Sequence, residues 1–136
     1  MNAVEAISSV IPMGTGAAFP LLVADIGGTN ARFGWVEDAG AQLACVETLT
    51  CADFSSPAAA ATRYLDTCHA GRKPARTAIA IASAIGDGPI KVTNSHWVLD
   101  PASFPDEIRT KSLQVFNDFE AIALVLPYLD HADFQL

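Results

Sequence analysis

Residues 21–35 read LLVADIGGTNARFGW, and this stretch constrains the fold more than any other part of the chain. An apolar run ends at one carboxylate, Asp25, and a Gly-Gly-Thr-Asn sequence follows before apolar residues return. A short apolar run bounded by glycines predicts a buried strand over residues 20–27 that turns into a second strand over residues 31–38. A third strand over residues 42–50 would complete an antiparallel meander, with Phe33, Trp35, Leu43 and Cys45 as candidates for its alternating faces.

The remaining sequence alternates between helical and strand patterns. Alanine-rich residues 57–69 predict a helix capped by Ser55 or Ser56 and ended by Gly71, with His69 at an end that favours a cation. The run RTAIAIAS that follows is typical of a central strand covered on both faces. The later segments are predicted to be a short hairpin within residues 86–100, a helix over residues 101–111, a strand ending at Asn117-Asp118 and an amphipathic helix after it.

The predicted order is therefore β-β-β-α-β-α-β-α, an α/β fold with a mixed five-stranded sheet, because a helix between strands implies a parallel crossover. A chain of 136 residues is the size of one domain. Residues 1–19 are expected to form a flexible extension, and the domain to begin at residue 20. The three cysteines lack CxxC spacing, and the sequence shows neither a signal-like leader nor a long apolar run. These features predict a cytoplasmic protein away from membranes.

The net charge of -7 argues against nucleic acid as a partner, because phosphate backbones attract clustered Lys and Arg. A small ligand is the better expectation, and in open α/β sheets such ligands bind at the carboxyl ends of strands. Both Asp25 and Asp118 are predicted to lie at such ends. Each also has an ordinary structural explanation: Asp25 can cap a tight turn, and Asp118 can cap the following helix.

The turn after Asp25 has the composition of an anion site. Gly27 and Gly28 leave the backbone N–H groups open to phosphate oxygens, and Thr29 and Asn30 can add polar contacts. Asp25 can orient a hydrated Mg²⁺, which prefers oxygen ligands. The alternative is that Gly27-Gly28 forms only a hairpin turn.

Three blocks carry a resemblance to a known family. DIGGTNARFG resembles the first phosphate motif of the bacterial glucokinases, in the hexokinase and actin-like ATPase superfamily, and VFNDFEAIALVLP resembles their sugar-binding and catalytic segment. Between them, AIAIASAIGDGPIKVTNSHW is similar to the central strand, Gly-Asp turn and TNxxW element of that family. The resemblance covers residues 21–136. It departs from the family pattern at Ala84, where a proline is usual, and alanine allows a looser backbone in the loop on the sugar side.

The resemblance implies a ribonuclease H-like (actin-like ATPase) domain that phosphorylates glucose with ATP and Mg²⁺. Asp25, Gly27, Gly28 and Thr29 would face the phosphates and the metal, Asn117 would bind sugar hydroxyls, and Asp118 would be the catalytic base. Asn94 would reach the sugar site, although an asparagine that stabilises a turn explains it equally well. Accepting a proton from the attacking hydroxyl is a role that a positioned carboxylate can fill.

The resemblance also implies that residues 20–136 are the smaller, N-terminal domain of a two-domain enzyme. The larger domain would supply the rest of the cleft, so the isolated chain is expected to show little turnover. A homodimer is compatible with this interpretation. Two alternatives stay open: a ROK-type kinase acting on another hexose or an amino sugar, and a sugar-sensing module of a longer regulatory protein.

Overall fold

The computed structural model describes residues 19–38 and 41–117. Residues 1–18 of the extension predicted over residues 1–19 lie outside the described residues. So do Asp118 and the helix expected after it. No helix within the described part of the chain is long and apolar enough to cross a bilayer. The elements are β1 (Leu21–Ile26), β2 (Asn30–Val36), β3 (Ala44–Thr50), the 3-10 helix η2 (Cys51–Asp53), α2 (Pro57–His69), β4 (Arg76–Ile81), β5 (Ile90–Lys91), β6 (Val98–Leu99), α3 (Phe104–Ile108) and β7 (Leu113–Asn117).

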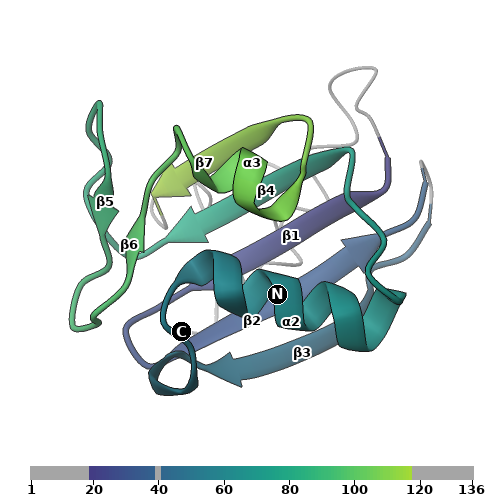
Figure 1. Ribbon diagram of the computed structural model, residues 1–136, viewed down its shortest axis with the longest axis horizontal. Helices are drawn as coiled ribbons and strands as arrows, with labels where there is room; N and C mark the ends of the chain where they lie inside the picture. Colours follow the sequence, from purple (N-terminus) through teal and green to yellow (C-terminus); the bar gives the residue numbers. More distant parts are fainter. Residues whose placement is uncertain (1–18, 39–40, 118–136) are drawn as a thin grey trace, which may run out of the picture.

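Five strands form one mixed sheet in the order β3-β2-β1-β4-β7. The pairs β1–β2 and β2–β3 are antiparallel, whereas β1–β4 and β4–β7 are parallel. Both the predicted meander and the predicted parallel crossover are thus confirmed. The carboxyl ends of β1, β4 and β7 consequently point to one edge of the sheet, and the separate β5–β6 hairpin stands at that edge (Figure 1).

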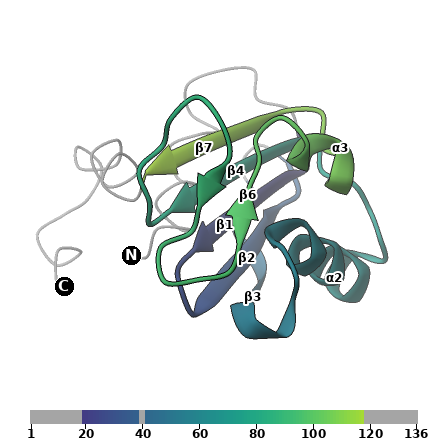
Figure 2. The same cartoon turned by 60° about the vertical axis from the view of Figure 1, so that its left-hand side comes forward.

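Both helices cover the same face of the sheet (Figure 2). The Ser56 hydroxyl caps α2 by accepting a hydrogen bond from the Ala59 N–H at 3.1 Å, and Pro57 occupies the first helical position. Small residues on the buried side of α2 let the helix approach the strands closely, while Tyr64 and Leu65 fill the remaining space. The core on this face includes Leu22, Ile79, Trp97, Phe104 and Ile108.

The opposite face carries a second, smaller apolar cluster of Leu21, Val23, Val36, Ala78 and Ala80. Residues 77–81 of β4 are fully buried, so the prediction of a central strand covered on both faces is confirmed.

Three local predictions were wrong. The helix predicted over residues 101–111 spans only α3, because Arg109 adopts a left-handed conformation (φ 61°) that ends it. At the end of α2 it is Ala70 (φ 52°) that first leaves the helical conformation, one residue before Gly71. The alternation across β2 and β3 is broken by a bulge between Phe33 and Trp35, and Cys45, at φ 50°, is exposed instead of facing the core.

Candidate functional site

The predicted site residues lie at the edge where the parallel strands end. Ile26, Ile81 and Asn117 are in register across β1, β4 and β7, and so are Asp25, Ala80 and Phe116 one position earlier. Residues in register on neighbouring strands share a face of the sheet, and successive residues alternate between faces. Asn117 is therefore on the face that the helices cover, whereas Asp25 is on the opposite face.

Asp25 lines a small pocket of about 300 Å³ together with Gly27, Asn30, Arg32 and Thr48. Asp25 and Arg32 are direct cross-strand partners, and the Arg32 Nε donates to the Thr48 hydroxyl at 3.4 Å. One carboxylate with neighbouring amide and hydroxyl oxygens fits a Mg²⁺ ion that keeps most of its water shell. Within the described ranges, no three His, Cys, Asp or Glu side chains form a cluster that could hold a metal without such water.

The two glycines of the turn have different structural roles. The Gly27 N–H donates to the Asn30 carbonyl at 3.0 Å, so this group closes the β1–β2 hairpin. A Cβ atom on Gly28 would lie 2.7 Å from the Thr93 carbonyl oxygen, closer than real contacts allow. Gly28 is therefore required where the β1–β2 turn packs against the turn of the β5–β6 hairpin. The predicted role of Gly28 in phosphate binding did not include this packing requirement.

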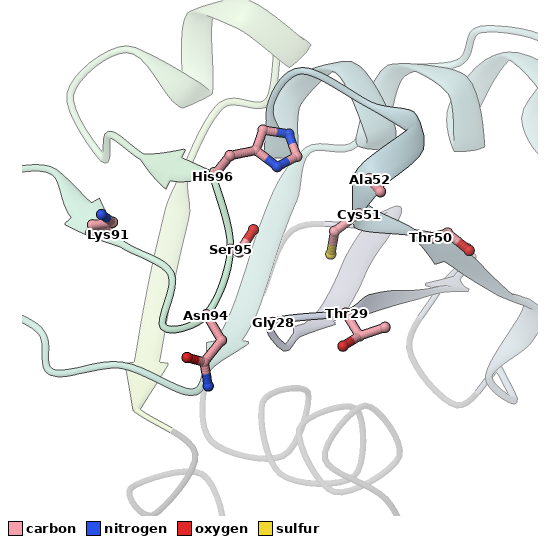
Figure 3. Close-up of a pocket in the computed structure, with 9 residues that line it drawn as sticks. All are labelled: Gly28, Thr29, Thr50, Cys51, Ala52, Lys91, Asn94, Ser95 and His96. Carbon is pink, nitrogen blue, oxygen red and sulfur yellow. The ribbon is translucent and has the colours of Figure 1, made fainter.

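A larger cleft of about 650 Å³ opens between the β1–β2 turn, η2 and the hairpin (Figure 3). Its lining includes Gly28, Thr29 and Asn94, three of the residues predicted from the sequence. Asn94 adopts the left-handed conformation (φ 60°) that asparagine tolerates better than most residues, which supports its turn role. The lining residues that sequence reasoning missed are Thr50, Cys51, Ala52, Lys91, Ser95 and His96.

No carboxylate is among the described residues that line this cleft, although the chain carries a net charge of -7. Lys91 and the His96 imidazole are its ionisable basic groups, and hydroxyls of Thr29, Thr50 and Ser95 add polar contacts. Burial raises the pKa of the Cys51 thiol, which contacts the Gly27 carbonyl at 3.5 Å and so stays protonated. This composition suits an anionic or hydroxyl-rich ligand.

The hairpin wall of the cleft is anchored to the loop after η2. The Phe54 carbonyl accepts hydrogen bonds from the Trp97 indole at 2.9 Å and from His96 Nε2 at 2.8 Å. Because a carbonyl only accepts, His96 Nε2 carries a hydrogen. Trp97 is fully buried and belongs to the core on the helix-covered face.

Asn117 is tied to the end of the neighbouring strand. Its Nδ2 donates to the Ser83 carbonyl at 3.1 Å, and the Ser83 hydroxyl accepts from the Thr93 N–H at 3.0 Å. The structure therefore connects Asn117 with the hairpin that carries Asn94 and, through Thr93, with Gly28. Sequence reasoning missed Ser83 because a serine after a buried strand has no distinctive pattern. Its position at the end of a predicted strand was the one signal that could have found it.

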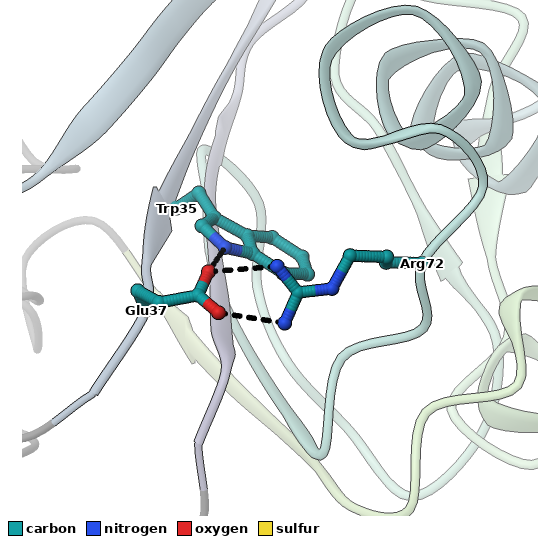
Figure 4. Close-up of polar contacts among 3 residues, drawn as sticks. All are labelled: Trp35, Glu37 and Arg72. Carbon is teal, nitrogen blue, oxygen red and sulfur yellow. Dashed lines mark hydrogen bonds and ion pairs between the residues drawn. The ribbon is translucent and has the colours of Figure 1, made fainter.

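A second polar cluster lies at the far end of the sheet from this cleft. Glu37 accepts hydrogen bonds from the Trp35 indole at 2.6 Å and from two Arg72 nitrogens at 3.0 and 2.6 Å (Figure 4). The Arg72 guanidinium holds the pKa of the Glu37 carboxyl below its usual range. His69 stacks on Trp35 at 4.1 Å, and burial lowers the pKa of His69. Burial thus works against the positive charge that was expected at this helix end.

A mixed α/β sheet with polar groups at the shared carboxyl edge defines a ligand-binding α/β domain. The chain matches the glucokinase protein family over residues 22–136. It is 39% identical over 117 residues to a glucokinase from Helicobacter pylori strain J99, covering 85% of this chain and 34% of that protein. This chain belongs to the glucokinase family, and it spans about a third of the length of the relatives that it matches.

Solved structures agree with the sequence comparison. A glucokinase from an Antarctic psychrotroph superimposes with a TM-score of 0.73 at 37% identity, over 83% of this chain and 36% of that chain. A glucokinase from Balamuthia mandrillaris, solved in complex with glucose, superimposes with a TM-score of 0.55 over 93% of this chain and 39% of that chain. At 15% identity the second likeness shows a shared fold.

Proposed function

We propose that this chain is the smaller domain of a glucokinase of the actin-like ATPase fold, which transfers the γ-phosphoryl group of ATP to glucose. The observation that carries the proposal is the arrangement of the parallel strands. Ile26 and Asn117 end β1 and β7 in register on either side of Ile81, so the start of the DIGGTN turn and the end of the VFN segment lie at one edge. Family membership then supplies the chemistry that this edge would perform.

The nucleotide end of the proposed site is formed by the β1–β2 turn. Gly28 and Thr29 would face phosphate oxygens from the large cleft, and Asn30 from the smaller pocket, where Asp25 would hold the metal ion. Gly27 would shape the turn, since its N–H already closes the hairpin. When bound at Asp25, a hydrated Mg²⁺ would neutralise phosphate charge, and few cations of this domain could do so in its place.

The sugar end would be formed by Asn117 and Asn94, with Asp118 as the base. The Asn117 Nδ2 donates to the Ser83 carbonyl, so the Oδ1 of the same amide points away from that carbonyl. This orientation would decide which side of the amide contacts a sugar hydroxyl. Asp118 follows Asn117 directly and lies outside the described residues. In this role it would orient the attacking hydroxyl and accept its proton.

The decisive experiment is Asp118→Asn in the complete polypeptide that contains this chain. We expect kcat for glucose phosphorylation to fall by about 10²–10⁴-fold, because the amide cannot accept the proton. Glucose binding should stay measurable. A coupled ADP assay and equilibrium dialysis with labelled glucose give the two readouts.

Asp106→Asn on the exposed side of α3 is the matched control, since it makes the same chemical change away from the cleft. It should keep the wild-type kcat. An Asp118→Asn variant as active as this control would remove Asp118 as the base. A panel of hexoses and amino sugars with the wild-type protein tests glucose as the substrate, because hydroxyl-specific hydrogen bonds decide between sugars.

A further inference from the structure

Ser83 stands where four segments of the proposed site meet. It follows the carboxyl end of β4, and Ala82 beside it donates its N–H to the Ile26 carbonyl at the end of β1 at 3.2 Å. The Ser83 side chain contacts Thr93 in the hairpin turn, and its carbonyl contacts Asn117 at the end of β7. No motif in the sequence singles it out.

The Ser83 hydroxyl uses all of its hydrogen-bonding positions. It donates to the Ala82 carbonyl at 2.7 Å and accepts from the Thr93 N–H at 3.0 Å. The Thr93 hydroxyl lies 3.1 Å away and, with the Ser83 hydrogen already used, donates as well. One donor and two acceptor positions are therefore filled, and the hairpin turn is attached to β4 through two of them.

This attachment reaches both asparagines of the proposed sugar end. Thr93 directly precedes Asn94, and its carbonyl packs so closely on the β1–β2 turn that only glycine fits there. The Ser83 carbonyl meanwhile fixes the orientation of the Asn117 amide. If the segment around Ser83 shifted, Asn94 and Asn117 would move relative to each other.

We propose that Ser83 is a positioning residue, which holds Asn94 and Asn117 in the relative placement that sugar binding requires. This inference rests on the proposed sugar-kinase function. Ser83 acts through its backbone and its bonds to Thr93 without touching the substrate. Orienting groups of this kind affect binding through the accuracy with which contacts are placed.

The test is Ser83→Ala in the complete polypeptide, with glucose and ATP kinetics measured separately. We expect KM for glucose to rise by about five- to tenfold, as the loss of the two hydrogen bonds to Thr93 would allow, and KM for ATP to rise by a smaller factor because Thr93 also packs on Gly28. Ser83→Thr keeps the hydroxyl and should restore KM for glucose. Ser103→Ala removes a hydroxyl from the Ser103–Glu107 contact beside α3, far from the cleft, and should leave both constants unchanged.

If Ser83 only stabilises the fold, Ser83→Ala should lower the apparent kcat in proportion to the amount of folded protein and should not change KM for glucose. This result would overturn the proposal. An unchanged KM in Ser83→Ala would do the same. If Ser83→Ala does not fold, Thr93→Val removes only the hydroxyl contact and should raise KM for glucose by a smaller factor, so equality with wild type would count against the proposal. A wild-type protein that phosphorylates no hexose would instead refute the proposed function, and this inference with it.

Discussion

Gly28 shows how one residue can be fixed by its neighbours alone. Its φ angle lies outside the left-handed region, so conformational freedom does not explain the glycine. What excludes a side chain is the Thr93 carbonyl at 2.7 Å and the Asn94 Cβ at 3.2 Å from the place where a Cβ would stand. A backbone carbonyl cannot rotate away as a flexible side chain can. The turn and the hairpin must therefore separate if Gly28 acquires a side chain.

Gly28→Ala should lower the free energy of unfolding by about 1–3 kcal/mol, the usual cost of forcing an extra methyl into a packed contact. Gly88→Ala is the matched control, because nothing lies within 4 Å of its Cβ position. That change should alter stability by less than about 0.5 kcal/mol. Urea unfolding of both variants provides the comparison, and equal stabilities would show that the turn accommodates a methyl group.

At the scale of elements, α2 depends on a single side-chain cap. The sequence left Ser55 and Ser56 as alternatives, and the structure selects Ser56, whose hydroxyl accepts from the Ala59 N–H. The helix otherwise consists largely of small residues on its buried side, so its start is defined by the cap and by Pro57.

Ser56→Ala should therefore cost about 1 kcal/mol of stability, because an orphan N–H loses its acceptor. Ser55→Ala, one residue earlier and exposed, removes a hydroxyl that does not cap α2 and should be nearly neutral. Thermal melting followed by circular dichroism at helix wavelengths distinguishes the two. Equal losses in both variants would mean that the cap contributes little to the folded state.

The elements also show what sequence reasoning can and cannot reach. Buried strands such as β1 and β4 were predictable, because a continuous apolar run next to a Gly-rich turn has few other solutions. The end of α3 was not, since the left-handed conformation of Arg109 is imposed by surrounding structure. The strand-end positions of Asp25 and Asn117 followed from the pattern. The contacts of Ser83 did not, because they join segments that only the folded sheet brings together.

At the scale of the sheet, the edge where β1, β4 and β7 end differs in character from the far end. The far end is closed by His69 stacked on Trp35 and hydrogen bonded to the Tyr64 hydroxyl at 3.0 Å. The Tyr64 hydroxyl donates to the Cys45 carbonyl at 2.8 Å, so it must accept from a hydrogen on His69 Nε2. Arg72 opposes a positive His69 and Glu37 favours it, but burial has the larger effect on its pKa.

Stability should consequently depend on pH through His69. Its pKa is lower in the folded chain than the ordinary value of 6.5, so the unfolded chain binds protons more readily and stability falls as pH drops below about 6.5. The effect is complete below the folded pKa. Glu37, whose pKa is lowered from 4.5, adds a separate loss at more acidic pH. Urea unfolding at a series of pH values measures both.

In His69→Gln, the free energy of unfolding should change less with pH between pH 7 and the range where carboxylates titrate. The reason is that glutamine keeps a hydrogen-bond donor for Tyr64 but does not titrate. His96→Gln, a change at the exposed hairpin, controls for the loss of any histidine. A His69→Gln profile parallel to that of wild type would assign the acid sensitivity to other groups.

The β5–β6 hairpin contributes no strand to the main sheet, although it is inserted between the adjacent strands β4 and β7. Descendants of this gene can therefore change the exposed stretch over residues 84–89 while inheriting the pairing of the five strands intact, whereas the buried Trp97 and Leu99 keep the hairpin itself in the core. Under the proposed function, a change of sugar preference would arise first among these exposed residues, and the scaffold behind them would record common ancestry.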